Sequence, residues 1–403
     1  MVDSGDVVRA AEAVADVARE TPVLPAKRLA RQVGGEIWLK LENLQVTGSF
    51  KVRGAVNRLS QMSDAEREAG VIAASAGNHA QAVAWAARKL GTKATLFMPE
   101  QAPLAKLAAV YEYGGEVELV EGMLDEAFVA AKAAAEAVGA TFVHAFDDPA
   151  VVAGQGTIGL ELLRQVPDIG TVVVPIGGGG LISGIALALR ASRPDVRVIG
   201  VQSDAIAPYA GVEAAETPST ICDGIAVKQP GELTGVLVKD LVDEVVTVSD
   251  DETAEAMVFL IERSKQVVEG AGAVGVAALM HGRAKPAATG ATVVVLSGGN
   301  VDATLLVEAI RLGETAAGRR MILATKIPDR PGGLASLLAL VAKLGANVLH
   351  VEHLRDGMDL HVRETAVQLV LQTRGPDHDE RILAAVQEAG YEPSSEPPRG
   401  DGG

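Results

Sequence analysis

A chain of 403 residues with 48% hydrophobic residues is long enough for two or three folded domains, which excludes a disordered protein. The net charge is −16 and the sequence pI is about 5.0, which disfavours nucleic acid and anionic membrane surfaces as partners. The single cysteine, Cys222, excludes an intrachain disulfide and a metal site made of several thiolates.

The first residues, MVDSGDVVRA, carry acidic side chains and lack the apolar stretch of a secretory signal. No run of about 18 apolar residues occurs without a charge or clustered glycines. We therefore expect a soluble, cytoplasmic protein with no membrane partner.

Apolar runs alternate with helical patterns over residues 20–312. A helix is expected at 6–20, ended by Thr21 and Pro22, and a strand at 36–41. Further strands are expected at 71–74, 94–98, 116–120, 141–144, 171–175, 196–201, 245–248 and 292–296. Helices are expected at 52–62, 78–90, 104–113, 122–138, 151–165, 181–191 and 251–267. This alternation is typical of an α/β fold with a parallel sheet covered on both faces.

The pattern changes after residue 312. Residues 313–320 are small, polar and charged, which predicts a linker between a domain at 1–312 and a second one at 321–395. The second domain is expected to contain strands at 321–327, 347–354 and 366–373, helices at 334–344 and 377–389, and a short strand near Tyr391. This βαββαβ order is typical of a ferredoxin-like domain, and residues 396–403 are expected to form a flexible tail.

Lys51 lies within the stretch LENLQVTGSFKVRG, residues 41–54, at the start of a predicted helix. A lysine taken alone is ordinarily a solvated surface charge. The alternative is an amine held for chemistry, which we expect to be buried and to have a lowered pKa.

Three turns that follow predicted strands favour that alternative. The first contains Ser75, Ala76, Gly77, Asn78 and His79, and its backbone N–H groups suit a carboxylate, although an ordinary helix cap is the favoured explanation for this turn taken alone. The second has four consecutive glycines, which allow close approach to a phosphate, and contains Gly177, Gly178, Gly179, Gly180 and Leu181. Its spacing matches neither a dinucleotide-binding nor a Walker A motif.

The third turn begins at Ser297, whose hydroxyl suits a heterocyclic nitrogen or a plain helix cap. If the strands before the three turns share one sheet, the turns converge at its carboxyl edge and face Lys51. A phosphate site, a hydrogen bond for a heterocycle and an amine together indicate a site for pyridoxal 5′-phosphate (PLP).

Six segments resemble, in order and spacing, the motifs of PLP-dependent threonine dehydratases (threonine ammonia-lyases) of fold type II. They are LENLQVTGSFKVRGA, SAGNHAQ, GQGTIGLE, PIGGGGL, TICDGIAVK and VVVLSGGN. The resemblance covers residues 20–312 and implies a tryptophan synthase β-like fold with two parallel-sheet subdomains.

The resemblance also implies a role for each matched residue. Lys51 matches the Schiff-base lysine, and Phe50 the residue beside the cofactor ring. Asn78 matches the asparagine at the ring hydroxyl, and Ser297 the serine at the pyridine nitrogen. The glycine turn matches the phosphate cup: Gly177, Gly178, Gly179, Gly180 and Leu181. The turn that matches the carboxylate site contains Ser75, Ala76, Gly77, Asn78 and His79.

The implied reaction deaminates L-threonine to 2-oxobutanoate and ammonia by elimination of water, with L-serine as a second substrate. Lys51 removes the α-proton, the β-hydroxyl leaves as water, and the enamine product hydrolyses. Serine racemases of this fold carry a second serine where this chain has Ala76, which disfavours racemisation.

The same racemases place an acidic metal ligand where this chain has Gln202 and Ser203, so no metal is expected. Glu269 and Asp204 remain alternatives as metal ligands, although surface or structural roles are expected for them. A serine racemase, another β-eliminating lyase and a non-catalytic amino-acid sensor remain alternatives.

The carboxyl-terminal segment resembles an ACT domain, a small regulatory fold that binds amino acids. The turn that matches its ligand site contains Asp329, Arg330, Pro331, Gly332, Gly333 and Leu334. An amino-acid effector is expected there, and the alternative is a dimerisation module without a ligand. The resemblance also implies a homodimer or homotetramer.

Overall fold

The computed structural model describes residues 2–212, 219–354 and 362–394. Contacts between residues divide the chain into two compact units, Met1–Leu306 and Val307–Gly403. Within the described part of the chain, none of the helices has the length and apolar character needed to span a membrane.

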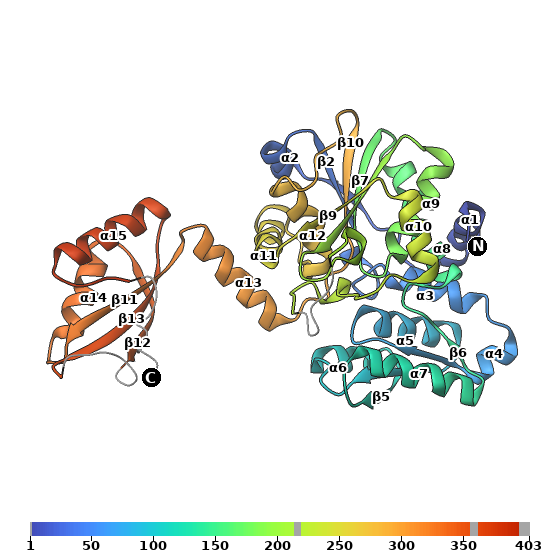
Figure 1. Ribbon diagram of the computed structural model, residues 1–403, viewed down its shortest axis with the longest axis horizontal. Helices are drawn as coiled ribbons and strands as arrows, with labels where there is room; N and C mark the ends of the chain where they lie inside the picture. Colours follow the sequence, from blue (N-terminus) through green and yellow to red (C-terminus); the bar gives the residue numbers. More distant parts are fainter. Residues whose placement is uncertain (1, 213–218, 355–361, 395–403) are drawn as a thin grey trace. The chain divides into compact units, whose positions relative to one another are not determined.

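The larger sheet of the first unit has six strands (Figure 1). The four-glycine turn and the turn at Ser297 follow two of these strands. Its order is β1 (Val23–Pro25), β2 (Glu36–Leu41), β10 (Ala291–Leu296), β7 (Ile169–Pro175), β8 (Arg197–Ser203) and β9 (Glu244–Val248). All neighbours are parallel except β1 and β2. The unpredicted β1 is a three-residue edge strand that includes a proline, too short to show a period.

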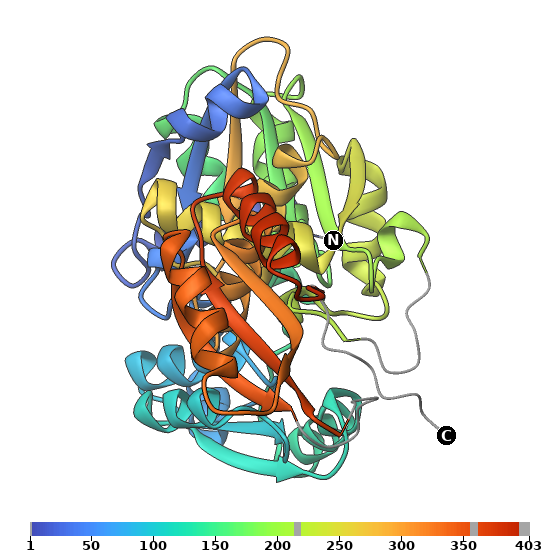
Figure 2. The same ribbon diagram turned by 90° about the vertical axis from the view of Figure 1, so that its left-hand side faces the viewer.

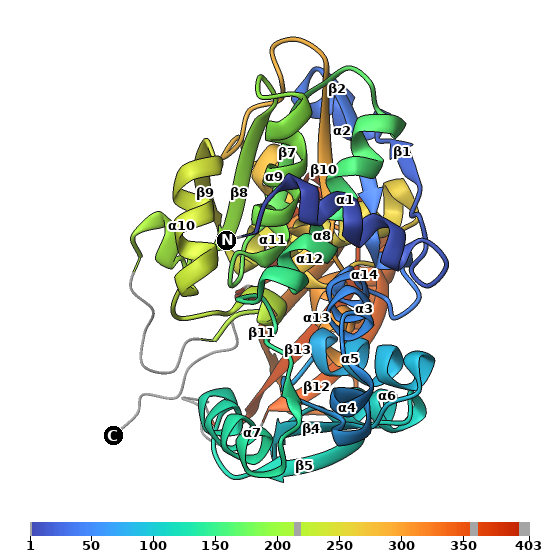
Figure 3. The same cartoon turned by 90° about the vertical axis from the view of Figure 1, so that its right-hand side faces the viewer.

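The smaller sheet has four parallel strands (Figure 3). Its order is β5 (Glu116–Val120), β4 (Ala94–Pro99), β3 (Val71–Ala74) and β6 (Thr141–Phe142). The turn after β3 therefore belongs to a different sheet from the turns after β7 and β10. The two parallel-sheet subdomains that the resemblance implied are therefore confirmed. The condition that all three turns follow strands of one sheet is not met, because strand pairing over long sequence separations is invisible to local patterns.

Thirteen helices of the described chain begin in the first unit. They are α1 (Ser4–Val14), α2 (Lys27–Val33), α3 (Lys51–Ser60), α4 (Asp64–Ala69), α5 (Asn78–Leu90), α6 (Leu104–Glu112), α7 (Leu124–Val138), α8 (Pro149–Gln165), α9 (Gly180–Ser192), α10 (Glu232–Leu241), α11 (Asp250–Phe259), α12 (Gly270–Met280) and α13 (Ala303–Ala316). The helix expected at 251–267 is shorter, because a π-turn at Leu260–Ser264 and a positive φ of 58° at Lys265 end it. Helix α12 has no polar face and is almost wholly buried, so no helical period revealed it.

Glycines bring α3, which begins with Lys51, close to α8 and bring α8 close to α9. A Cβ at Gly154 of α8 would lie 2.6 Å from the carbonyl oxygen of Arg53 in α3. A Cβ at Gly184 of α9 would lie 2.3 Å from the carbonyl oxygen of Val152 in α8. The helix backbones therefore touch directly, which leaves α3 little freedom to move.

A buried ionic cluster reinforces the same contact. The guanidinium of Arg53 donates to Glu42 at 2.8 and 2.9 Å and also to Glu161 of α8, while Lys40 of β2 pairs with Glu161. Arg53, Lys40 and Glu42 are at most 1% exposed. The cluster ties β2, α3 and α8 together beneath the segment that carries Lys51.

The second unit contains an antiparallel sheet with two helices side by side on one face (Figure 2). The sheet order is β11 (Arg320–Pro328), β13 (Glu364–Gln372) and β12 (Asn347–Leu354), and the helices are α14 (Gly333–Lys343) and α15 (Pro376–Glu388). Where a last strand was predicted near Tyr391, the described residues form a single bridge between Ala324 and Ser394. Residues 313–316, expected in a linker, form the end of α13, and the predicted tail at 396–403 lies outside the described residues.

Candidate active site

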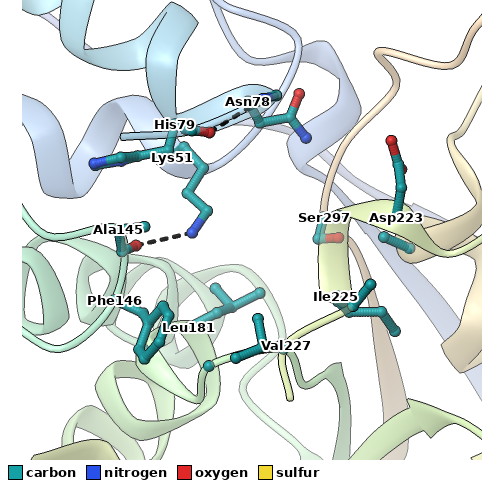
Figure 4. Close-up of a pocket in the computed structure, with 18 of the residues that line it drawn as sticks. Lys51, Asn78, His79, Ala145, Phe146, Leu181, Asp223, Ile225, Val227 and Ser297 are labelled. Atoms are coloured by element: carbon teal, nitrogen blue, oxygen red, sulfur yellow. Dashed lines mark hydrogen bonds between the residues drawn. The ribbon is translucent and has the colours of Figure 1, made fainter. Parts of the chain in front are cut away.

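A pocket of about 200 Å³ brings together turns from both sheets of the first unit (Figure 4). The sequence-predicted residues that line it are Phe50, Lys51, Ser75, Ala76, Gly77, Asn78, His79, Gly177, Gly178, Gly179, Gly180, Leu181 and Ser297. The turns converge because the carboxyl ends of strands in the two sheets face the same space.

Lys51 is the first residue of α3 and extends into the pocket. Its Nζ donates to the carbonyl oxygen of Ala145 at 2.8 Å and lies 5.3 Å from the centre of the Phe50 ring. Burial lowers the pKa of Lys51 to about 8, and the nearby charge of Glu269 opposes this shift. The predicted lowering of this pKa is confirmed, and the amine is partly neutral near physiological pH.

His79 points away from solvent and stays neutral. Burial lowers the pKa of His79 to about 3, and the nearby charge of Lys51 acts in the same direction. The neutral ring therefore donates from Nε2 to the carbonyl oxygen of Val143 at 2.9 Å. A neutral imidazole adds no positive charge beside Lys51.

The turn from Ser75 to His79 leads into α5. Ser75 Oγ accepts from the backbone N–H of Gly77 at 3.1 Å. Among the described residues no side chain caps the amino terminus of α5, so N–H groups of its first turn face the pocket without a helical partner. This end of the helix is suited to a carboxylate.

The four-glycine turn requires glycine at two positions, Gly178 and Gly179, and leaves little space at Gly180. Gly179 has a φ of 93°, and a Cβ there would lie 2.6 Å from Tyr209 Oη. A Cβ at Gly178 would lie 2.2 Å from the ring of Phe146, and one at Gly180 would lie 3.0 Å from the carbonyl oxygen of Phe146. The turn opens the 13-residue helix α9, so its N–H groups form a cradle suited to a phosphate.

Ser297 follows β10 and is 3% exposed at the edge of the pocket. Its carbonyl oxygen accepts from the backbone N–H of Phe50 at 3.1 Å. This bond joins the backbone of Ser297 to that of Phe50, the residue before Lys51, so the two segments are held next to each other at the pocket.

Glu269 is a pocket residue that the sequence placed on the surface or in a structural role. It is 6% exposed, and its Oε1 accepts from Asn78 Nδ2 at 2.7 Å. Asn300 Nδ2 donates to Asn78 Oδ1 at 2.8 Å, so the Asn78 amide is held at both ends. Burial raises the pKa of Glu269 to about 7, and the negative charge of Asp223 acts in the same direction. The signal in the sequence was an acid in the otherwise apolar, glycine-rich segment VVEGAGA.

Lys106 and Asp223 form a second pair that sequence reasoning missed. Lys106 lies in α6, and Asp223 begins the 3₁₀ helix η3 (Asp223–Ile225). Their side chains form an ion pair, and both line the pocket. Their 117-residue separation left no local signal for this contact.

Asp204 lies outside the residues that line this pocket, and burial raises the pKa of its carboxyl. Within the part of the chain that the structure describes, no three His, Cys, Asp or Glu side chains form a group suited to a metal ion.

Comparison with known proteins shows relatives along the whole chain. An L-threonine ammonia-lyase of Thermotoga maritima is 45% identical over 399 residues, covering 97% of this chain and 99% of that protein. An L-threonine ammonia-lyase of Geobacter sulfurreducens is 46% identical over 380 residues, covering 93% of this chain and 94% of that protein. The catabolic L-threonine dehydratase TdcB of Escherichia coli is 43% identical over 304 residues, which cover 74% of this chain and 92% of TdcB.

Solved structures agree with these relatives. Maize serine racemase has a TM-score of 0.72 and 35% identity, covering 77% of this chain and 97% of its own. The processed form of threonine deaminase isoform 2 from Solanum lycopersicum has a TM-score of 0.71 and 35% identity, and the match covers 77% of this chain and 88% of that one. The family model described as "Pyridoxal-phosphate dependent enzyme" matches residues 14–298. The chain therefore belongs to the family of pyridoxal-phosphate dependent enzymes, with the α/β architecture of fold type II.

Proposed function

We propose that this protein is a threonine ammonia-lyase, which converts L-threonine to 2-oxobutanoate and ammonia and also accepts L-serine. The observation that carries the proposal is an amine of lowered pKa, Lys51, in one pocket with a glycine cradle and an uncapped helix terminus. Full-length relatives named L-threonine ammonia-lyase support the choice of substrate.

The pocket residues fit pyridoxal 5′-phosphate. The glycine cradle, in which a Cβ at Gly178 would meet Phe146, would hold the phosphate through backbone N–H groups. Ser297 would hydrogen-bond the pyridine nitrogen, Phe50 would lie beside the ring, and Lys51 would bind the aldehyde carbon. When bound, the cofactor supplies an electron sink for the carbanion formed at the substrate α-carbon.

The protein's own groups would bind the substrate and move its proton. The carboxylate would accept from N–H groups of the turn Ser75–His79, at the uncapped end of α5. Asn78 donates one N–H to Glu269, which leaves its second N–H for the oxygen substituent of the ring.

Lys51 would act as the base that removes the α-proton, because its lowered pKa makes the neutral amine available near neutral pH. The β-hydroxyl then leaves with a proton as water, and one water is consumed when the product hydrolyses. The net change is L-threonine to 2-oxobutanoate and ammonia.

The first test removes the amine. Lys51→Ala should lower kcat for L-threonine by about 10²- to 10⁴-fold or more and should abolish the cofactor absorbance above 400 nm. Oxoacid release and the absorbance spectrum measure the two effects. Lys89→Ala, on the exposed side of α5, is the matched control and should retain both. Wild-type protein that shows no such band with added PLP, or no oxoacid from L-threonine, would contradict the proposal.

Serine racemisation is the second candidate, since the fold is shared with maize serine racemase. Ala76 occupies the position where the racemases carry a second serine, so no hydroxyl is available there as the opposite-face base. Following D-serine and oxoacid together separates the two activities. A D-serine yield comparable to the oxoacid yield would favour the racemase.

We infer that the second unit is an ACT-like regulatory domain at 321–395, joined through 313–320 to a catalytic domain at 1–312. Support comes from its two helices on one face of an antiparallel sheet and from the turn before α14. Gly332 has a φ of 90° there, and a Cβ at Gly333 would lie 2.3 Å from the carbonyl oxygen of Pro328. The turn Asp329–Leu334 would present N–H groups of α14 to the carboxylate of an amino-acid effector.

We also propose a homodimer or homotetramer. β12 is an edge strand of its sheet, and such edges can pair between subunits. Light scattering of the purified protein measures the assembly, and a monomer at micromolar concentration would contradict it.

A further inference from the structure

The Lys106–Asp223 pair joins the two walls of the active-site pocket. Lys106 lies in α6, which packs on α5 and β5 of the smaller sheet. Asp223 lies in η3, which packs on α12 beside the larger sheet. The Lys106 side chain is 15% exposed and that of Asp223 is 55% exposed. The lysine is therefore enclosed at the pocket while its partner remains largely in solvent.

The ammonium of Lys106 also lies beside the turn assigned to the substrate carboxylate. A Cβ built on Gly77 would be 3.8 Å from Lys106 Nζ. Gly77 precedes the first turn of α5, whose N–H groups face the pocket. A carboxylate at this turn would thus meet the positive end of a helix and a lysine ammonium together.

The charges around this position favour a cation. Asp223 and Glu269 line the same wall, and burial raises the pKa of Glu269 to about 7, so part of its charge remains at neutral pH. Lys51 is the other pocket lysine among the described residues, and it is committed to the reaction. An incoming carboxylate would face two acids unless Lys106 balanced them.

Asp223 can release the lysine at little cost. An ion pair with a half-exposed partner is weak, because solvent screens the charge and hydrates the released carboxylate. The Lys106 ammonium already lies 3.8 Å from a Cβ built on Gly77, and its long side chain is flexible, so it could reach a carboxylate at this turn with a small movement.

We propose that Lys106 is a substrate-binding residue whose ammonium moves from Asp223 to the α-carboxylate when the amino acid enters the pocket. Asp223 holds the lysine in place while the pocket is free of substrate. This inference rests on the proposed deamination and adds a side-chain contact to the backbone site for the carboxylate.

The test compares the two halves of the pair in the holoenzyme. Lys106→Gln should raise KM for L-threonine about 10-fold or more and change kcat much less, because a charge-assisted bond to the bound carboxylate is lost. Asp223→Asn should leave KM equal to or below that of the wild type, because it removes a competitor for the ammonium. Lys106→Arg should retain most of the affinity.

A substrate without the carboxylate charge provides the second readout. Wild-type protein should prefer L-threonine over L-threoninamide in kcat/KM, and Lys106→Gln should lose about 10-fold or more of this preference. Lys89→Gln, an exposed lysine on α5, is the matched control and should keep the wild-type values. Circular dichroism of each variant verifies folding.

The outcomes distinguish this proposal from a structural latch and from failure of the proposed function. If Asp223→Asn raises KM as Lys106→Gln does, the pair only holds the pocket walls and the proposal is overturned. Unchanged KM and unchanged preference in Lys106→Gln overturn it as well.

If the wild type does not deaminate L-threonine, the proposed function fails by itself. Binding of 3-hydroxybutanoate, followed through the cofactor spectrum, then decides the role of Lys106. Weaker binding in Lys106→Gln but not in Asp223→Asn supports the contact, and equal binding in all three proteins overturns it.

Discussion

At the scale of single residues, the half-buried Lys51 and the buried Glu269 are pocket groups whose pKa values shift toward each other. Burial lowers the pKa of Lys51 to about 8 and raises that of Glu269 to about 7. Burial favours the neutral form of each group, and their mutual attraction opposes it only in part. The pocket therefore contains, near neutral pH, an amine that can accept a proton and an acid that is half ionised.

Replacing Glu269 should change how stability depends on pH. The folded chain binds the Glu269 proton more tightly than the unfolded chain, whose glutamate pKa is 4.5. Wild-type stability should therefore fall as pH rises from about 4.5 to about 7. Glu269→Gln cannot ionise and should gain, relative to wild type, about 3 kcal/mol or less between pH 5 and pH 8. Urea denaturation of the cofactor-free protein measures this difference.

The lowered pKa of Lys51 affects the free energy of unfolding in a different pH range. The pKa of Lys51 is about 8 in the folded chain and 10.5 in the unfolded chain. The unfolded chain therefore binds the proton more tightly, and stability rises as pH increases from about 8 to about 10.5. Glu12→Gln, an exposed glutamate of α1, is the control and should follow the wild type at both pH values. If the free energies of unfolding of Glu269→Gln and wild type change in parallel between pH 5 and pH 8, burial does not raise the pKa of Glu269.

At the scale of elements, the position of Lys51 depends on how α3 packs. The backbone of α3 touches α8 near Gly154, and Arg53 pairs with Glu42 and Glu161 below it. Close helix contact and a buried ionic cluster together hold the first turn of α3 in place.

Arg53→Met should destabilise the protein by about 3–5 kcal/mol, because it leaves Glu42 and Glu161 buried with less compensating charge. Chemical denaturation of the holoenzyme measures the change. Arg311→Met is the matched control: its pair with Glu308 has both side chains more than half exposed, 56% and 60%, and should be worth less than about 1 kcal/mol. A similar loss of unfolding free energy in both variants would mean that the buried ionic cluster stabilises the protein no more than an exposed ion pair does.

At the scale of the whole molecule, the chain divides into two units, and TdcB, a threonine dehydratase, matches only 74% of the chain. Truncation after Ala317 keeps the whole of α13 and removes β11 and everything beyond it. The truncated protein should keep kcat for L-threonine within a few-fold of the full chain and lose any response to isoleucine or valine.

Steady-state kinetics with and without each branched-chain amino acid, on both proteins, measures that response. An effector response that survives in the truncated protein would place the regulatory site in the first unit. Loss of activity on truncation would instead indicate that the second unit supports the fold of the first.

The glycine-rich turn and the buried strands could be recognised from local sequence patterns. Glycine is required at Gly178 and Gly179 for reasons of backbone space and φ, so the glycine turn was visible as a motif. The buried parallel strands were equally visible, because strands covered on both faces are continuous apolar runs. Lys51 could be singled out because it lies in one of these motifs.

Which distant side chains share the pocket depends on long-range packing that local patterns do not record. The turns converge from two sheets instead of one, Asn78 meets Glu269 across 191 residues, and Lys106 meets Asp223 across 117. Helix and strand periods report which face of an element is buried, and they carry no information on which element covers it. The backbone requirements of the glycine turn are local and left a pattern, whereas the charge balance around Lys51 arises from long-range contacts and left none.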